Sequence, residues 1–381
     1  MDDTKVIVDP LEDKTCIVVG TRPGIIKMSP LIEEFQQRDC QSFVIHAGQH
    51  YSDNLNAKIF DDLGLARPEH HLENVKEAEY HGEQTAAMLE GIERILLEER
   101  PENVLVCGDA NFNLAGALAA RKLRLTLGHV EAGLRSDDWR MPEEHNRVMI
   151  DHISNYLFAP TAEGRENALE DNVKGEVRVT GNTIVDAIQR NLPRARARSE
   201  VLREYALESD EYIVFTAHRE ENVDNEQILK QFVSVIEMLT TDWNLPVVYP
   251  IHPRTRDRLA QFGLAEQTER IEELYLVPPL GYLDFLKLVS EAACALTDSG
   301  GVQEESCIMQ VPCVTLRENT ERPETVDVGA NVIAGVEPSS ILAATKEALD
   351  IEREWENPFG DGNTSERIAD ILLQSVRETG S

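Results

Sequence analysis

Four carboxylates stand in or near apolar, strand-like stretches, where they could move protons. Asp109 follows VLVCG, Glu131 lies in GHVEAGLRS, and Glu143 and Glu144 share RMPEEHNR. A carboxylate at the end of a buried strand is costly unless it is paired or used in catalysis. Carboxylates that converge on one site would suit the removal and return of a proton. The structural alternative is a set of salt bridges to nearby arginines, namely Arg135, Arg140 and Arg147.

Two further stretches have the features of an anion-binding site. GTRPGIIKMSP places Arg22 before a predicted helix and Lys27 within its first turns, where free N–H groups and the helix dipole also favour an anion. The alternative there is an ordinary turn with solvated cations. DSGGVQEES places residues 299–301 between a strand and a helix, and paired glycines let the backbone approach a phosphate. Glu305 follows, and it either favours the helix dipole or accepts hydrogen bonds from the hydroxyls of a nucleotide.

Two strands end in a histidine followed closely by an arginine. FTAHREEN contains His218 and Arg219, and YPIHPRT contains His252 and Arg254. A lone histidine is more often a core residue than a catalyst, but the polar neighbours of His218 favour a functional role. The same argument is weaker for His252. The sequence has no HExxH, CxxC or GxGxxG, so it predicts neither a metal site nor bound NAD.

These residues are positioned by a regular alternation of short apolar runs and longer amphipathic stretches. Strands are predicted at 15–20, 42–48, 103–109, 125–133, 156–160, 177–182, 211–219, 246–252, 274–279, 294–300, 312–317 and 330–335. Helices are predicted at 29–37, 82–99, 113–123, 225–241, 281–292, 302–310 and 365–376. The alternation predicts an α/β protein with two Rossmann-like, doubly wound parallel sheets. Because ligands bind beyond the carboxyl ends of such strands, we expect these residues to line a central cleft.

Length and charge bound the class of protein. The chain has 381 residues, which suits two domains, and the polar segment 183–200 is the predicted junction. A formal net charge of −32 opposes non-specific binding to nucleic acid or an anionic membrane. Because salt screens such self-repulsion, we interpret the charge as a halophilic adaptation to a salty cytosol. The sequence has no long apolar run, no signal peptide pattern and no CxxC spacing among its six cysteines. It therefore predicts a cytoplasmic protein.

Several of these stretches belong to a longer series of motifs. In order, they are GTRPGIIKMSPL, HAGQH, GHVEAGLRS, PEEHNR, VTGNTIVDA, TAHREENVDN, DSGGVQEES and TERPETV, and NPFGDGNTSERI follows near the C-terminus. The series resembles the non-hydrolysing UDP-N-acetylglucosamine 2-epimerases over nearly the whole chain. TAHREENVDN resembles the archaeal branch, and the acidic composition then indicates a haloarchaeal member.

The resemblance implies a glycosyltransferase-B-like fold: an N-terminal domain at 1–184 with the catalytic carboxylates, a UDP-binding domain at 185–366, and a C-terminal helix at 367–381 that packs on the first domain. It also implies reversible conversion of UDP-N-acetylglucosamine (UDP-GlcNAc) into UDP-N-acetylmannosamine (UDP-ManNAc). UDP leaves by anti elimination, giving 2-acetamidoglucal, and adds back as C2 is reprotonated on the other face. The family requires neither metal nor NAD, and a homodimer is the family expectation.

The resemblance assigns catalytic roles residue by residue. The family's catalytic residues match Asp109, Glu131, Glu143 and His218. Some members are activated by UDP-GlcNAc at a second site near GQH, and Gln49 and His50 are retained here as possible allosteric residues. The chain departs from the family at Gly24, where glutamate is usual, and in the CGDANFNLAG stretch, where a threonine-rich run is usual.

A second set of residues is implied to bind UDP or the sugar. Its members are Arg22, Lys27, Arg135, Arg219, His252, Phe285, Ser299, Gly300, Gly301, Glu305 and Arg317. Within this set, residues 299–301 match the diphosphate cradle, Glu305 matches the ribose ligand, and the backbone of Phe285 matches the contact to uracil.

Other functions remain alternatives at this point. A hydrolysing relative would release UDP and free N-acetylmannosamine (ManNAc), and another 2-epimerase would act on a modified UDP-sugar such as a 2,3-diacetamido derivative. A glycosyltransferase of the same architecture gives no joint role to Asp109, Glu131 and Glu143. A non-catalytic sensor of nucleotide sugars would need neither these carboxylates nor His218.

Overall fold

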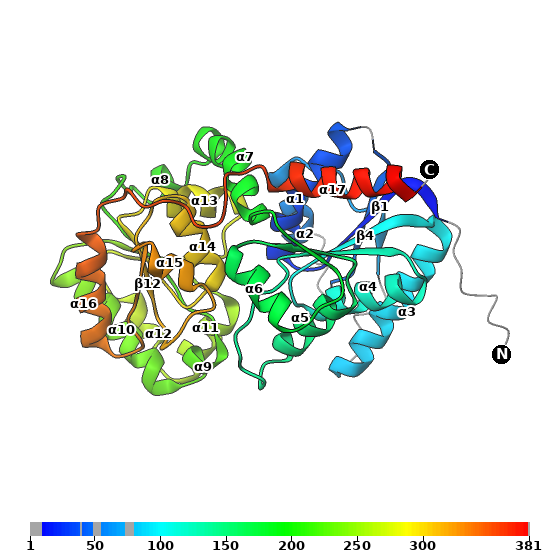
Figure 1. Cartoon of the computed structure of the whole chain (residues 1–381). Helices are drawn as coiled ribbons and strands as arrows, with labels where there is room; N and C mark the ends of the chain where they lie inside the picture. The colour runs from blue at the N-terminus through cyan, green and yellow to red at the C-terminus, as the bar shows by residue number, and fades with distance from the viewer. Residues whose placement is uncertain (1–9, 39, 49–54, 73–79, 380–381) are drawn as a thin grey trace. The chain divides into compact units, whose positions relative to one another are not determined.

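The structure, a computed structural model, describes residues 10–38, 40–48, 55–72 and 80–379, and it divides into two compact units. The first unit comprises Met1–Ala187 and Phe359–Ser381, and the second comprises Ile188–Pro358. Each unit is built around one parallel β-sheet with helices packed on its faces (Figure 1).

The first unit has a seven-stranded sheet in the order β3-β2-β1-β4-β5-β6-β7, and neighbouring strands are parallel. Its strands are β1 (Leu11–Val19), β2 (Ser42–His46), β3 (His70–His71), β4 (Pro101–Cys107), β5 (Thr126–Val130), β6 (Tyr156–Ala159) and β7 (Glu176–Val179). The strand order reverses between β1 and β4. In an open α/β sheet this switch point is where ligands bind, beyond the carboxyl ends of the strands.

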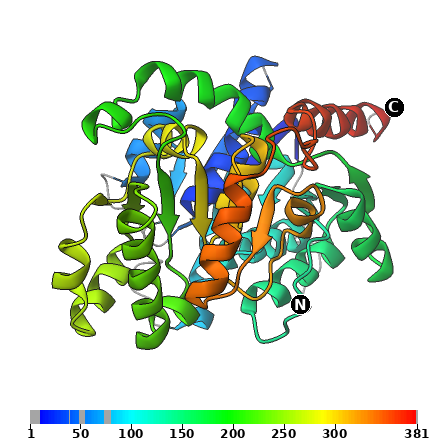
Figure 2. The same ribbon diagram turned by 90° about the vertical axis from the view of Figure 1, so that its left-hand side faces the viewer.

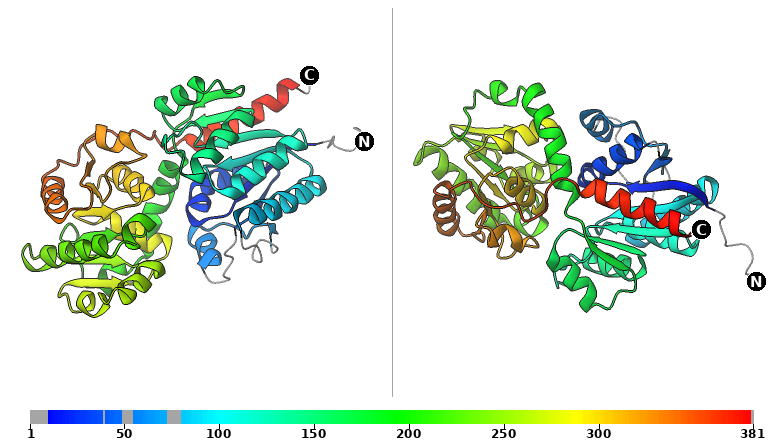
Figure 3. Two further views of the ribbon diagram at one scale, coloured as in Figure 1. Left: turned by 90° about the horizontal axis from the view of Figure 1, so that it is seen from below. Right: turned by 45° about the horizontal axis from the view of Figure 1, so that its top comes forward.

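The helices of the first unit connect its parallel strands. They are α1 (Arg22–Gln37), α2 (Leu55–Leu63), α3 (His81–Glu99), α4 (Asn111–Lys122), α5 (Pro142–Ile153), α6 (Ala162–Glu170), α17 (Thr364–Thr379) and the first residues of α7 (Thr183–Arg198). The last helix, α17, lies along α1 and β1, as the right-hand view of Figure 3 shows. Nη1 of Arg38, the C-cap residue of α1, lies 2.5 Å from Oδ1 of Asp370 on α17. The buried carboxylate of Asp186 accepts from the N–H of Ser365 at 2.8 Å, which satisfies a backbone donor in the first turn of α17.

The second unit has a six-stranded parallel sheet in the order β10-β9-β8-β11-β12-β13, with its switch point between β8 and β11. Its strands are β8 (Ile213–Thr216), β9 (Val247–Pro250), β10 (Leu274–Val277), β11 (Cys294–Thr297), β12 (Cys313–Thr315) and β13 (Asn331–Ile333). Its helices are α8 (Val201–Glu204), α9 (Glu220–Val223), α10 (Glu226–Thr241), α11 (Pro253–Gln261), α12 (Ala265–Glu269), α13 (Tyr282–Ser290), α14 (Gly300–Ile308), α15 (Pro323–Asp327), α16 (Pro338–Leu349) and the rest of α7. Figure 2 shows α16 lying across one face of this sheet.

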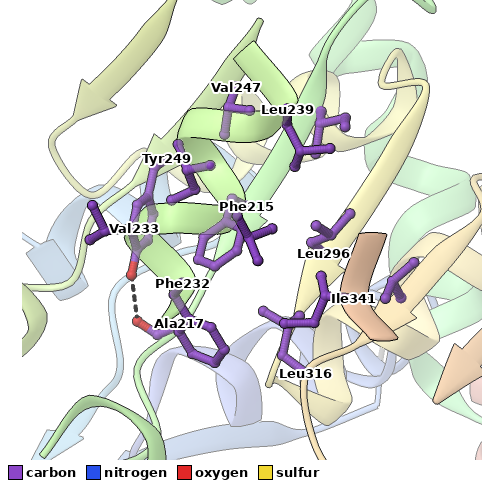
Figure 4. Close-up of a cluster of buried hydrophobic side chains, with 14 of the residues drawn as sticks. Phe215, Ala217, Phe232, Val233, Leu239, Val247, Tyr249, Leu296, Leu316 and Ile341 are labelled. Atoms are coloured by element: carbon purple, nitrogen blue, oxygen red, sulfur yellow. Dashed lines mark hydrogen bonds between the residues drawn. The ribbon is translucent and has the colours of Figure 1, made fainter. Parts of the chain in front are cut away.

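The core of the second unit has two layers because successive strand residues point to opposite faces. On β8, Phe215 joins the cluster on one face, whereas Val214 joins the cluster on the other. Figure 4 shows the first cluster, in which the ring of Phe215 lies edge-on to that of Tyr249, with 4.9 Å between ring centroids. The hydroxyl of Tyr249 donates to the carbonyl oxygen of Ala217 at 3.0 Å, so the one polar atom of this buried ring has a partner.

Every predicted strand overlaps a strand of the structure, whereas one short strand and several helices were not predicted. The two-residue strand β3 and the helices α2 and α5 were missed because they are short or polar. The predicted junction at 183–200 contains the boundary between the two units, at Ala187 and Ile188, but the segment is largely the helix α7, which continues through Pro193. Ile184, Val185 and Ile188 are buried along it, and this apolar side outweighs the helix-breaking effect of proline.

The described part of the chain also bears on the expectations about membrane spans and cysteines. None of its helices is both long enough and apolar enough to span a membrane. All six cysteines fall in this part, and none forms a disulfide; five are buried and Cys40 is half-buried.

Candidate functional site

In the first unit, the residues singled out from the sequence follow three adjacent strands at the switch point. Arg22 and Lys27 follow β1, Asp109 follows β4, and Glu131 follows β5. Glycines allow the segments to meet there: a Cβ at Gly48 would lie 1.8 Å from the carbonyl oxygen of Gly20. These strand ends therefore gather cations and carboxylates at the edge where the fold class binds ligands.

Glu131 is the most enclosed of the predicted catalytic carboxylates. It is 7% exposed, and its φ of 65° is a left-handed conformation that is rare for a non-glycine residue. Nζ of Lys27 lies 2.5 Å from its Oε1, and Nδ2 of Asn182 donates to the same oxygen at 3.2 Å. The thiol of Cys107 lies 3.6 Å from Oε2. This carboxylate is thus held by an ion pair and hydrogen bonds from several elements.

Asp109 is more accessible, and α5 holds it from the side. Its side chain is 35% exposed and forms a salt bridge with Arg147, and Nδ2 of Asn146 donates to its backbone carbonyl at 2.8 Å. Both partners come from α5, a helix that the sequence analysis did not predict. Arg147, one of the arginines named in the salt-bridge alternative, is therefore a partner of Asp109. Because the side chain of Asp109 is 35% exposed, part of its carboxylate stays accessible.

The two neighbouring glutamates on α5 differ in solvent exposure. Glu143 is exposed in the first turn of the helix, whereas Glu144 is 1% exposed. Glu144 accepts from the hydroxyl of Ser136 at 2.8 Å and lies 3.0 Å from Nη1 of Arg147. Glu143 therefore has the accessibility that a catalytic group needs, and Glu144 holds the loop that precedes the helix.

Arg135 has a different surrounding from the one predicted for a substrate-binding residue. Its side chain is 9% exposed, and its Nη2 donates to Asp151 at 2.7 Å and to Asp171 at 2.8 Å. Burial lowers the pKa of Arg135 and the two carboxylates raise it, with a net rise above its usual value. The guanidinium of Arg135 thus links segments of the first unit through Asp151 and Asp171. These two partners are too distant in the sequence for the pairing to be predicted from it.

In the second unit, a buried aspartate organises the end of β8. Asp298 is fully buried and accepts from the backbone N–H groups of His218 and Arg219, each at 3.0 Å, and from Nδ2 of Asn222 at 3.2 Å. Nδ1 of His218 lies 3.2 Å from Oδ1 of Asp298, and the imidazole is 45% exposed. Burial raises the pKa of Asp298, but its hydrogen bonds, above all with His218, lower the pKa by more. The net pKa therefore lies below the usual value. Asp298 thus orients the accessible His218.

The helix α14 presents its N-terminus beside this aspartate. Ser299 is the N-cap, and Gly300 and Gly301 begin the helix. Because a Cβ added at Gly301 would approach nothing closer than Oγ of Ser299, at 3.8 Å, the first turn is open to a ligand. Free N–H groups at such a helix start favour an anion.

Two of the predicted binding arginines meet at one glutamate in the same unit. Nη1 of Arg317 lies 2.7 Å from Oε2 of Glu321, and Nη2 of Arg219 lies 3.6 Å from the same oxygen. Burial raises the pKa of Glu321 and the two arginines lower it, with a net fall to about 2. Glu321 was not among the residues predicted from the sequence, although it lies in the motif TERPETV.

The remaining predicted binding residues of the second unit differ in their surroundings. Glu305 is half-buried on α14, one residue after Glu304, which is 1% exposed and paired with Arg322 at 2.5 Å. His252 caps α11 and is exposed. Phe285 on α13 is half-buried against one of the two core clusters, so its side chain has a packing role.

Two further expectations concern a metal site and the possible allosteric residues. Within them, no group of three or more His, Cys, Asp or Glu could hold a metal ion. Gln49 and His50, the possible allosteric residues, lie outside the described residues.

The two parallel sheets, with polar and charged residues beyond their strand ends, define a two-domain α/β protein of the class that binds ligands at those ends. Residues 33–373 match the family model for UDP-N-acetylglucosamine 2-epimerase. The chain is 47% identical to the UDP-N-acetylglucosamine 2-epimerase of Methanococcus maripaludis over 363 residues, which cover 94% of this chain and 98% of the relative. The chain belongs to the UDP-N-acetylglucosamine 2-epimerase family and is an isomerase.

Solved structures agree with this assignment. The crystal structure of the Methanocaldococcus jannaschii UDP-GlcNAc 2-epimerase in complex with UDP-GlcNAc and UDP matches with a TM-score of 0.87 and 46% identity, covering 95% of this chain and 99% of that one. Phytolacca americana UGT2, complexed with UDP-2-fluoro-glucose and pterostilbene, matches with a TM-score of 0.56 and 13% identity over 97% of this chain and 95% of that one. The second match concerns the fold alone, which is glycosyltransferase-B-like.

Proposed function

We propose that this chain converts UDP-GlcNAc reversibly into UDP-ManNAc without releasing the free sugar. The observation that carries the proposal is a pair of carboxylates at neighbouring strand ends, each held by a cation: Asp109 by Arg147 and Glu131 by Lys27. Family membership supports the reaction, and the complex of the M. jannaschii relative with UDP-GlcNAc and UDP supports these two ligands for this chain.

The elimination step breaks the C2–H and C1–O bonds of UDP-GlcNAc and gives UDP, 2-acetamidoglucal and a proton held by the enzyme. The addition step forms the C1–O bond again and places a proton on the opposite face of C2. Because the C2 proton is poorly acidic, its removal needs a positioned base, and its return from the other face needs a second group. Asp109, Glu131 and Glu143 are the proposed proton-transfer groups.

The departing diphosphate needs stabilisation as its negative charge develops. The open N-terminus of α14 at Gly300 and Gly301 offers backbone donors for this purpose. His218 stands beside it, oriented by Asp298, and Arg219 and Arg317 add positive charge. These groups are the proposed diphosphate site.

Two other parts of the nucleotide have proposed partners in the same unit. Glu305, about one turn into α14, is the proposed ligand of the ribose hydroxyls. The backbone at Phe285 is the proposed contact of the uracil, which is compatible with the packing of its side chain in the core.

One experiment separates this reaction from its alternatives. The purified full chain is incubated with UDP-GlcNAc in D₂O at high salt, and the products are followed by NMR. We expect UDP-ManNAc that carries deuterium at C2, with UDP still attached to the sugar at equilibrium. Stoichiometric release of UDP and free ManNAc would show a hydrolysing enzyme instead. Absence of exchange at C2 would reject epimerisation of this substrate and direct attention to a modified UDP-sugar.

A further inference from the structure

A buried ion pair joins the strand ends that carry Asp109 and Glu131. His129 on β5 and Asp151 on α5 are both fully buried, and Nδ1 of His129 lies 2.6 Å from Oδ1 of Asp151. Neither residue belongs to the proposed catalytic or binding sets. A buried ion pair is often no more stabilising than apolar residues of the same volume, so stability alone does not account for it.

One end of the pair reaches the backbone just before Asp109. Nε2 of His129 donates to the carbonyl oxygen of Gly108 at 3.1 Å. Because a carbonyl oxygen only accepts, the contact with Gly108 places a hydrogen on Nε2, and Nδ1 faces the Asp151 carboxylate. Burial raises the pKa of Asp151, but His129 and Arg135 lower it by more, so that it lies below its usual value.

The other end of the pair reaches the turn that follows Glu131. Oδ2 of Asp151 accepts from the backbone N–H of Gly133 at 3.1 Å. The turn uses two left-handed residues, with φ of 65° at Glu131 and 79° at Gly133. A Cβ at position 133 would lie 1.8 Å from the carbonyl oxygen of Gly164. A non-glycine residue keeps such a conformation only where surrounding contacts hold it, and Asp151 supplies one of them.

We propose that the His129–Asp151 pair positions the two neighbouring carboxylates for proton transfer. It does so by holding the backbone that precedes Asp109 and the turn that follows Glu131. The inference rests on the proposed function, because it assigns proton transfer to these carboxylates. Both members of the pair act through other residues and touch no substrate, so they are positioning residues.

Two single variants at His129 separate the contacts of its ring. In His129→Gln the amide nitrogen takes the approximate place of Nε2 and keeps a donor for Gly108, whereas in His129→Asn it takes that of Nδ1 and keeps a donor for Asp151. We expect kcat to fall in both, by up to about 100-fold, since small displacements of reacting groups have effects of this size. KM, and the affinity for UDP measured by calorimetry, should change far less than kcat, because the proposed diphosphate site lies in the second unit.

A double variant distinguishes positioning from a purely structural role. Asp151→Asn alone removes the carboxylate that faces both His129 and Arg135, which should lower the melting temperature strongly. In His129→Gln/Asp151→Asn the histidine is replaced as well and Arg135 keeps Asp171, so we expect the melting temperature to recover in part while kcat stays low. Recovery of kcat together with stability would overturn the inference, as would wild-type kcat in both single variants at His129.

The control is His152→Gln, which changes an exposed histidine on the same helix, directly after Asp151. It should leave kcat and the melting temperature unchanged. The wild-type enzyme in the D₂O experiment provides the second reference. If the wild type shows no exchange at C2, the proposed function fails. If the wild type shows exchange and the variants match it, the positioning role alone fails.

Discussion

Lys27 and Glu131 form an enclosed ion pair in which Nζ lies 2.5 Å from Oε1 and the two side chains are 12% and 7% exposed. The pair joins the first turns of α1 to the end of β5, two segments that are 104 residues apart. A carboxylate withdrawn from water keeps its charge only when such partners compensate for the lost hydration. Both the position and the charge of Glu131 therefore depend on Lys27.

Removal of the lysine should affect stability and turnover together. In Lys27→Met the side chain keeps its approximate length, but Glu131 loses its cation. We expect the free energy of unfolding to fall by about 3–5 kcal/mol, the range for breaking one side of a buried pair, and epimerisation to be largely lost. Denaturant unfolding at constant salt measures the first effect, and initial rates on UDP-GlcNAc measure the second.

The matched control is Lys230→Met on α10. Lys230 pairs with Glu226, and both side chains are about half exposed, at 53% and 52%. An exposed pair within one helix contributes about 0.3–0.5 kcal/mol, so this variant should be nearly as stable and as active as the wild type. If both lysine variants lost stability equally, burial of the Lys27–Glu131 pair would not explain its importance.

The sequence predicted the fold well because the central parallel strands, such as β4 and β11, are buried on both faces and therefore appear as short apolar runs. It also placed Asp109, Glu131 and His218 at strand ends, since those ends are marked by the change from apolar to polar residues. The pairing of these residues could not be predicted in the same way. Asp298, which orients His218, follows a strand some 80 residues further along the chain.

Exposure on a helix was a second property that the sequence could not settle. Glu143 and Glu144 are adjacent in the sequence, and only the phase of α5 decides that the first is exposed and the second is buried. Arg135 shows the same limitation, because its partners Asp151 and Asp171 are distant in sequence. The sequence had offered Arg135 as a salt-bridge partner as well, and its role in binding the substrate stays a prediction.

Substitutions of the adjacent glutamates Glu304 and Glu305 on α14 should differ in their effects on UDP affinity and melting temperature. Glu304 is 1% exposed and lies 2.5 Å from Nε of Arg322, whereas Glu305 is half-buried and is the proposed ribose ligand. We expect Glu304→Gln to lower the melting temperature with little change in the affinity for UDP. Glu305→Gln should weaken UDP binding by about tenfold, the value of one charge-assisted hydrogen bond, with the melting temperature retained. Calorimetry with UDP and a thermal melt of each variant test both statements; reversed effects would exchange the two roles.

Asp298 should give the second unit an acid-sensitive component of stability. Its folded pKa lies below the usual value, so its contribution is fully present above the unfolded pKa of about 3.9 and is lost as pH falls through the folded pKa. Asp298→Asn cannot titrate. The difference in unfolding free energy between the wild type and this variant should therefore be constant above about pH 5 and shrink below about pH 4. Denaturant unfolding at pH values on both sides of this range measures the difference, and a difference that grew on acidification would contradict the assignment.

Adaptation to high salt stays a prediction of the composition, and melting temperature can test it. With a net charge of −32, repulsion among acids destabilises the folded chain until salt screens it. We expect the melting temperature to rise steadily from about 0.1 M to molar KCl, over which the Debye length falls from about 10 Å to 3 Å. The triple variant Glu352→Gln/Glu354→Gln/Glu356→Gln removes three exposed acids from one short segment of the second unit. It should melt higher than the wild type at low salt and at nearly the same temperature at high salt. A melting temperature that is flat across the salt range, or a variant that gains equally at all salt concentrations, would show that charge repulsion does not limit the stability of this protein.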